Sequence, residues 1–73
     1  MWTVNEITIG TKTYKYWMKH FEEGSEFGID GGRISKLQIN EGDKMVCNYD
    51  RGWEKKPTGA AKKAYDALIA KYN

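Results

Sequence analysis

The sequence predicts an α+β fold in which two β-hairpins form a four-stranded antiparallel sheet (ββββα) and one C-terminal helix packs on one face. Two patterns carry this prediction. The first 50 residues contain runs of β-branched and aromatic residues separated by turns that contain glycine. Residues 58–72 instead place apolar residues three and four positions apart, which is the spacing of an amphipathic helix. No repeat or linker divides the 73 residues, so we expect one α+β domain over residues 1–73.

The first hairpin joins residues 3–9 to residues 12–21 through a two-residue loop that begins with Gly10. Glycine in the first position of such a loop is typical of a type II′ turn, because that position requires a positive φ. The turn sets the register of the two strands. It predicts these opposed pairs: Thr3–Met18, Val4–Trp17, Asn5–Tyr16, Glu6–Lys15, Ile7–Tyr14 and Thr8–Thr13.

A second hairpin and the helix follow. Residues 34–40 and 45–50 are predicted strands around a polar turn in which Gly42 can take a left-handed conformation. The helix is expected from about Thr58, a candidate N-cap, to Tyr72. Because one helix covers only one face of a sheet, the opposite face is left without a covering element.

Side-chain alternation along the strands divides the large residues between these two faces. The residues assigned to the core are Ile7, Tyr14, Tyr16, Met18, Leu37, Ile39, Met45, Cys47, Tyr49, Tyr65 and Leu68. The uncovered face then carries a mixture of apolar and basic residues: Trp2, Val4, Lys15, Trp17, Lys19 and Phe21. Both faces of the first hairpin carry large residues, so an exchange of the two faces stays open. Apolar rings on an uncovered face indicate contact with a loop, a second copy or a partner.

Composition limits the classes of partner. The net charge of +2, from 12 basic and 10 acidic residues, is too small to require nucleic acid or an anionic membrane. Cys47 is the only cysteine, so no internal disulfide can form, which favours a reducing compartment; we expect a cytoplasmic protein. No segment is apolar over the length of a membrane-spanning helix, and we expect no membrane association.

Candidate catalytic groups are scarce. His20 is the only histidine, and Cys47 falls on the predicted core face, where we expect an inert buried thiol. The sequence has no Ser-His-Asp arrangement, no H-E-x-x-H motif and no cluster of cysteines that could hold zinc. We therefore predict a protein that is not an enzyme and uses neither a cofactor nor a metal.

The segment EEGSEFGIDGGR, residues 22–33, contains four glycines and connects the two hairpins. Such a loop either presents backbone N–H groups to an anion or forms a structured crossover. It lacks the lysine and serine that end a phosphate-binding P-loop, and it does not lead into a helix. The crossover is therefore the favoured interpretation.

The two arginines, Arg33 and Arg51, lie at the edges of loops. Asp30 and Asp50 are their candidate internal partners, in which case ion pairs order the loops. The alternative is that the arginines face a binding partner together with Trp53, because Arg and Trp are enriched at binding hot spots.

A cluster of lysines lies near the predicted start of the helix, at positions 55, 56, 62 and 63. Positive side chains there oppose the helix macrodipole, which favours negative charge at that end. The cluster is either a solvated face, the favoured interpretation, or a site for a phosphate group or an acidic partner.

The stretches YKYWMKHFEEGSEFGIDGGRISKLQI and NYDRGW extend over most of the chain. With these residues the sequence resembles a family of small proteins with a domain of unknown function, found in Firmicutes and their phages and mobile elements. The resemblance implies no activity and no catalytic residues. It implies a hypothesis about function, which is that a compact phage protein inhibits a host defence protein by occluding one of its surfaces.

The leading hypothesis is a non-enzymatic protein-binding module that acts by steric occlusion. Its binding residues would be Trp17 and Phe21 on the uncovered face, or Arg33, Arg51 and Trp53 at the loop edge, with Asp30 beside them. The alternative is single-stranded nucleic-acid binding, in which rings stack on bases while Lys15 and Lys19 contact phosphates. A homodimer through the uncovered face is the third interpretation.

Overall fold

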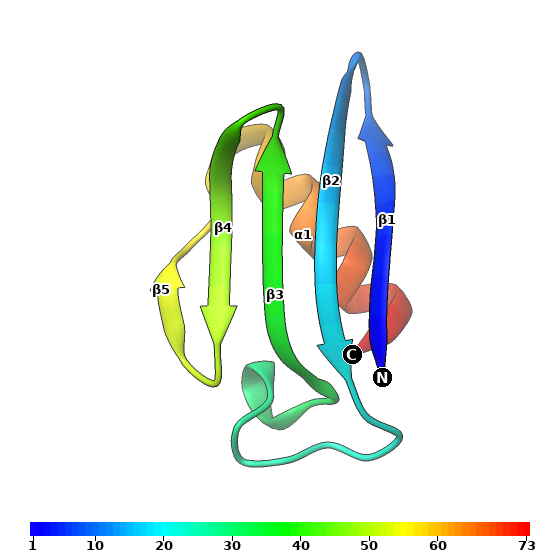
Figure 1. Ribbon diagram of the computed structural model, residues 1–73, viewed down its shortest axis with the longest axis vertical. Helices are drawn as coiled ribbons and strands as arrows, with labels where there is room; N and C mark the ends of the chain where they lie inside the picture. Colours follow the sequence, from blue (N-terminus) through cyan, green and yellow to red (C-terminus); the bar gives the residue numbers. More distant parts are fainter.

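The computed structural model describes all of residues 1–73, and it shows a five-stranded antiparallel sheet with one helix behind it (Figure 1). The strands lie across the sheet in the order of the sequence. The elements are β1 (Trp2–Ile9), β2 (Lys12–His20), the short 3-10 helix η1 (Ile29–Gly31), β3 (Ile34–Glu41), β4 (Lys44–Asp50), β5 (Trp53–Lys55) and α1 (Gly59–Tyr72). The α+β class and the antiparallel sheet are confirmed, whereas the sheet has five strands rather than four. The chain contains no helix with the length and apolar character needed to cross a bilayer.

The first hairpin has the predicted turn and register. Gly10 has a φ of +63° while Thr11 lies outside the positive-φ region, which is the combination found in a type II′ turn. Every predicted pair is present. At the end near the turn, the Oγ1 atoms of Thr8 and Thr13 lie 3.0 Å apart and share a hydrogen bond.

The fifth strand is the main departure from the predicted fold. After β4, Arg51 takes a left-handed conformation with a φ of +57°, and its N–H donates to the carbonyl oxygen of Ser35 at 2.9 Å. The chain reverses there, and β5 pairs with β4. Three residues are too few to show an alternating pattern, and a non-glycine residue at positive φ gives no turn signal in the sequence. Periodicity therefore does not reveal this strand.

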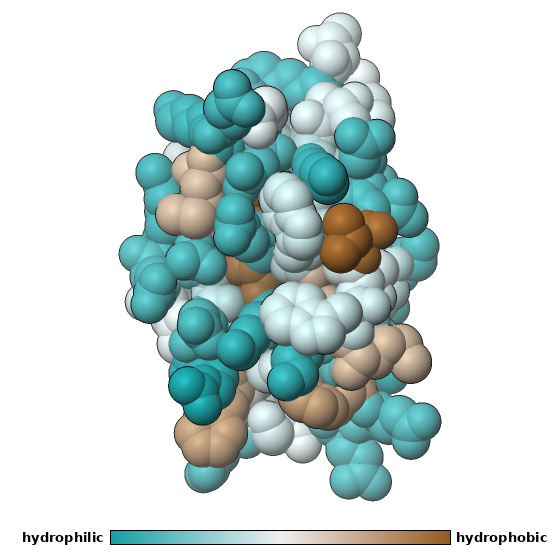
Figure 2. All heavy atoms as spheres, in the orientation of Figure 1, coloured by the Kyte–Doolittle hydropathy of each residue, from teal (hydrophilic) through white to brown (hydrophobic).

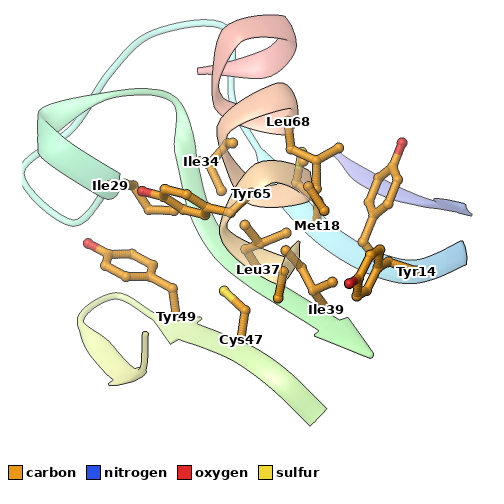
Figure 3. Close-up of a cluster of buried hydrophobic side chains, with 13 residues drawn as sticks. Tyr14, Met18, Ile29, Ile34, Leu37, Ile39, Cys47, Tyr49, Tyr65 and Leu68 are labelled. Atoms are coloured by element: carbon orange, nitrogen blue, oxygen red, sulfur yellow. The ribbon is translucent and has the colours of Figure 1, made fainter. Parts of the chain in front are cut away.

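The core lies between α1 and the sheet (Figure 3). From the helix side, Tyr65 and Leu68 point toward Leu37 and Met18 of the strands. The remaining buried residues of this cluster are Tyr14, Tyr16, Ile29, Ile34, Ile39, Cys47, Tyr49, Ala61 and Ala64. The tyrosine face of the first hairpin is thus the buried one, which resolves the ambiguity that the sequence left open. Ile7 packs against the cluster but is only half-buried.

The assignment of Met45 to the core is wrong. Ile39 pairs with Cys47 while Asn40 pairs with Met45, so Val46 is an extra residue in β4. Such a β-bulge shifts the alternation of side chains by one position. Val46 consequently packs against the core, and Met45 is 37% exposed.

The helix spans Gly59–Tyr72, and Thr58 is in the N-cap position, as predicted. The backbone of Thr58 is extended, as an N-cap requires, but its side chain makes no capping hydrogen bond. The N–H groups of the first helical turn therefore keep no side-chain acceptor.

Candidate binding surface

The face of the sheet opposite α1 carries a continuous strip of large side chains. The pairings place Val4, Trp17, Gln38 and Asn48 side by side across β1 to β4. Trp2 lies one step along β1, opposite Lys19. Figure 2 shows this face, with less hydrophilic side chains gathered over β1 and β2 and hydrophilic ones around them. We call this region the open face.

The open face exposes several apolar residues on and beside β1 and β2. Trp2 is 58% exposed and Val4 is 54% exposed, while Trp17 is half-buried between its neighbours. Phe21, just beyond β2, is 46% exposed. These side chains lie on or next to two adjacent strands, so they form one patch rather than isolated surface residues.

Two lysines lie over the rings of this patch. The Lys15 Nζ is 5.1 Å from the ring centroid of Trp17. The Lys19 Nζ is 6.0 Å from the Trp2 ring and 5.5 Å from the Phe21 ring. Neither lysine has a carboxylate within ion-pair distance, because the four salt bridges of the protein involve other cations. The open face therefore presents ammonium groups supported by rings rather than neutralised by acids.

A depression of about 340 Å³ lies beside the patch. Trp2 and Trp17 line it together with side chains from β3 and β4, including Gln38, Asn48 and Asp50. Polar groups near an apolar rim can fix the orientation of a bound side chain by hydrogen bonds. Sequence analysis missed the polar residues of this depression. The sequence does contain a signal for them, because Gln38 and Asn48 alternate with core positions of the same strands and so belong to the open face.

The second predicted surface, around Arg51 and Trp53, is not one surface in the structure. The Trp53 ring packs edge-on against Tyr49, with centroids 5.1 Å apart, and at a tilt against Tyr65 of α1, with centroids 5.5 Å apart. These contacts place it on the helix side. Arg51 extends from the turn after β4, where its Nε lies 3.8 Å from Asp50. Trp53 therefore supports the edge of the core, away from the patch that contains Trp17.

The glycine-rich crossover is folded on itself. A side chain at Gly24 or Gly28 would collide with the carbonyl oxygens of Gly31 and Gly32, so these glycines allow backbone segments to approach one another. The fully buried Ile29 anchors the loop in the core. These contacts support the interpretation of residues 22–33 as a structured crossover.

Polar contacts from distant parts of the chain hold the crossover in place. The Tyr49 hydroxyl donates to the carbonyl oxygen of Phe27 at 2.9 Å. The side-chain amide of Asn73 donates to the carbonyl oxygen of Ile29 at 3.0 Å and accepts from the N–H of Ile34 at 2.9 Å. The helix C-terminus and β4 thus fix both ends of η1.

The predicted Asp–Arg network forms only in part. Asp50 pairs with Arg51 and also with Lys36, whose Nζ is 3.7 Å away. Asp30 and Arg33 form no ion pair; Asp30 is exposed in a left-handed conformation with a φ of +51°. Arg33 instead borders a second depression next to Phe21, of about 320 Å³. Arg33 therefore lies at the lower margin of the open face.

Comparison with known families adds one relationship. A family model described as a domain of unknown function (DUF7678) matches residues 1–73. The chain belongs to the DUF7678 family. This confirms the resemblance to a domain of unknown function. No curated protein and no solved structure matches the chain.

The titratable groups of this DUF7678 domain that suggested chemistry occupy structural positions. Burial raises the pKa of the Cys47 thiol to about 12, so the sulfur is held in its protonated form. The His20 Nε2 lies 3.0 Å from the Thr3 hydroxyl, and its ring packs at a tilt against Tyr72, with ring centroids 5.3 Å apart. The pKa of His20 is lowered by burial, by the N-terminal amine and by Arg33. No group of three His, Cys, Asp or Glu side chains is arranged to hold a metal ion.

Proposed function

We propose that this DUF7678 domain is a non-enzymatic protein-binding module that uses its open face to cover a surface of its partner. The observation that carries the proposal is the patch of Trp2, Val4, Trp17 and Phe21 on an otherwise polar sheet face. Aromatic anchors surrounded by polar side chains are the composition of interface hot spots.

The chemistry of the partner surface follows from the open face. The centre of the partner surface would accept the aromatic side chains of this domain in apolar pockets, and the rim of the partner surface would carry carboxylates. The carboxylates are inferred from Lys15 and Lys19, which form no salt bridge within the protein, although Glu6 lies opposite Lys15 on β1. Such charge complementarity increases the rate of association and selects among partners.

Steric occlusion is the mode of action that fits this domain best. The open face is formed by rigid antiparallel strands, and the proposal requires no bond to be made or broken. The resemblance to phage and mobile-element proteins extends the proposal to a host defence protein as the partner.

Substitutions on the open face test this proposal. The tagged protein and its Trp17→Ala variant would be used to capture proteins from a lysate of the organism that encodes the domain. Phe27→Ala is the matched control, because Phe27 is also an exposed ring, 52% exposed, but lies in the crossover. We expect a discrete protein to be retained by the wild type and by Phe27→Ala, and to be lost from Trp17→Ala. Equal retention by all three would contradict the proposal.

The competing interpretations are outcomes of the same experiment. Rings and lysines on an antiparallel sheet also suit single-stranded nucleic acid, since bases stack on exposed ring faces. Here the lysines already lie over those rings, which favours a protein partner. Captured material that disappears after nuclease treatment would replace the protein partner by nucleic acid. A light-scattering mass twice that of the 8.4 kDa chain, reverting to the monomer in Trp17→Ala, would replace it by a second copy.

A further inference from the structure

The two edges of the sheet differ in length and in protection. At one edge, β5 contains three residues, and Lys56 and Pro57 follow it directly. At the other edge, β1 contains eight residues without a proline, a lysine or a β-bulge. Figure 1 shows α1 behind the sheet and no segment beside β1 in the plane of the sheet. Natural proteins usually shield a long edge strand, because its free backbone groups can pair with another strand. β1 is therefore an unprotected edge.

The hydrogen bonds of the first hairpin show which backbone groups of β1 are free. Met1 and His20 exchange two bonds, at 3.2 and 3.0 Å. Because such pairs alternate along an antiparallel ladder, the odd-numbered residues of β1 bond to β2, and the even-numbered residues direct their N–H and C=O groups outward. The N–H of Glu6 agrees with this, since it donates to the side-chain oxygen of Asn5 at 2.8 Å and not to β2. The outward groups belong to Trp2, Val4, Glu6 and Thr8.

The same even-numbered residues place their side chains on the open face, where two charges lack an ion pair. Glu6 is exposed and forms no salt bridge, and neither does Lys19. The two charges are kept apart within one chain, because Lys19 lies opposite Trp2 and not opposite Glu6. The Lys19 Nζ is 6.0 Å from the Trp2 ring, so it leans toward the outer edge of β1. An acidic side chain added beside Trp2 would therefore meet an ammonium group.

A second copy of β1 supplies that acidic side chain when the two strands run antiparallel about a two-fold axis at Val4. This register places Trp2 opposite Glu6 of the second copy, and Val4 opposite Val4 of the second copy. The exposed Val4 side chains would cover one another, and each Glu6 would lie next to the Lys19 ammonium of the other copy. On the helix side, Thr3 would lie opposite Asn5, so polar side chains also meet. The edge is thus complementary to itself in charge and in polarity.

Neighbouring registers are less favourable. With the axis at Glu6, the two Glu6 carboxylates would lie directly opposite each other, and like charges in that position are destabilising. With the axis at Asn5, each Val4 would lie opposite a Glu6, so that an apolar side chain would face a charge. A shift by a single residue in one strand alone would place open-face residues opposite helix-side residues. The axis at Val4 is the register that the side chains favour.

We propose that β1 pairs with β1 of a second copy of this chain, antiparallel and centred on Val4, to form one continuous sheet. The outward N–H and C=O groups of Trp2, Val4 and Glu6 bond to those of the second copy, and the Asn5 side chain releases the N–H of Glu6. Both helices lie on one side of the joined sheet, and the two open faces lie on the other. This contact leaves Trp17 exposed, so it does not rest on the proposed protein-binding function.

The first test is the mass of the protein in solution as a function of concentration. One pair of strands is a small interface, so we expect the weight-average mass in sedimentation equilibrium to rise from 8.4 kDa toward twice that value as the concentration approaches about 1 mM. A mass that stays at 8.4 kDa over this range would overturn the proposal. Trp17→Ala should dimerise as the wild type does. A dimer lost in that variant would place the contact on the open face and not on the edge.

Two lysine variants test the register. Val4→Lys places two ammonium groups opposite each other at the axis, and we expect it to stay monomeric. Thr8→Lys is the matched control, because Thr8 is also an exposed outward residue of β1 but lies beyond the paired segment. It adds the same charge and should dimerise as the wild type does. A dimer in Val4→Lys, or equal losses in both variants, would contradict the proposed register.

Engineered cysteines report the same register covalently. The two Cα atoms of a hydrogen-bonded antiparallel pair are about 5.5 Å apart, which a disulfide can span. Val4→Cys should therefore cross-link under mild oxidation, whereas Thr8→Cys should not, because its two cysteines lie at opposite ends of the pairing. The native Cys47 is buried and does not compete. Equal cross-linking of the two variants on a non-reducing gel would show random collision and overturn the register.

A charge exchange tests the contact between Glu6 and Lys19 of the two copies. Because the contact occurs twice in the dimer, Glu6→Lys should weaken dimerisation about tenfold. The double variant Glu6→Lys/Lys19→Glu should restore it. Recovery cannot arise within one chain, since the two residues do not lie opposite each other there. A double variant that dimerises no more tightly than Glu6→Lys would overturn the contact.

Discussion

The two faces of the sheet carry alternate residues of the same strands, but one face is buried under α1 and the other stays open to solvent. Along β2, Tyr14, Tyr16 and Met18 are buried beneath α1, while Lys15 and Trp17 between them remain on the open face. Both sets are large and suit a β-strand, so neither strand propensity nor alternation chooses between them. The choice is made by α1, whose apolar stripe can cover only one face.

This difference separates stability from function. The covered face holds the buried core residues, whose contacts form within the folded chain itself. Truncation of one of these side chains leaves a cavity in the core. The open face exposes rings that only a second molecule can bury. Substitutions on the two faces should therefore change different measurements.

The largest expected effect is on the covered face. Leu37→Ala removes a side chain that is buried at the centre of the core, and it should lower the free energy of unfolding by about 2–5 kcal/mol. A domain of 73 residues has little stability in reserve, so the variant is expected to be partly unfolded at room temperature. Trp17→Ala, on the open face, should cost markedly less. Equal losses in urea denaturation would show that the open face also holds the fold together.

The crossover gives the next largest effect. Gly28→Ala would drive a methyl group into the carbonyl oxygen of Gly32, and overpacking of this kind costs roughly 1–3 kcal/mol. Gly52→Ala is the matched control, because a side chain there would meet open space and its φ is not positive. Thermal unfolding should separate the two variants. A Gly28→Ala variant as stable as Gly52→Ala would mean that the crossover is looser than the structure shows.

Two buried tyrosines on the covered face provide a finer comparison. Tyr49→Phe removes a hydroxyl that donates to Phe27, and it should cost about 1 kcal/mol. Tyr14→Phe removes a buried hydroxyl without a partner, so it should be neutral or stabilising by up to about 1 kcal/mol. Both values follow from chemical denaturation. A destabilising Tyr14→Phe would indicate a partner for that hydroxyl inside the protein.

The smallest effect concerns pH. Burial, the N-terminal amine and Arg33 lower the pKa of His20, so the unfolded chain takes up a proton at a higher pH than the folded protein. The stability associated with neutral His20 is present above the unfolded pKa of about 6.5 and is lost as pH falls through that value toward the folded one. His20→Gln should flatten the dependence of the unfolding free energy on pH as pH falls below about 6.5. An unchanged slope in that variant would assign the dependence to other groups.

Local chemistry made much of the fold predictable. Gly10 alone sets the turn and register of the first hairpin, and the stripe of Ala61, Ala64, Tyr65 and Leu68 defines the helix. The features that were missed depend on positions with no local signal. The bulge at Val46, the left-handed Arg51 and the short β5 each arise because neighbouring segments supply hydrogen bonds and packing.

The candidate sites divide in the same way. Trp17, Lys15 and Lys19 were expected together because they alternate on one strand, whereas Trp53 was grouped with Arg51 only by closeness in sequence. The structure brings Tyr14 and the first turn of α1 to one depression, although more than 40 residues separate them in the chain. Proximity of this kind has no local pattern.

By itself, the sequence determined the α+β class, the register of the first hairpin and the extent of the helix, because each depends on residues a few positions apart. The tertiary structure alone decided which face of the sheet is covered, and it brought Tyr14 and the first turn of α1 to one depression. The physical reason is that burial belongs to the packing of distant segments: a strand can present large residues on both sides, and only the helix that packs against it excludes water from one of them.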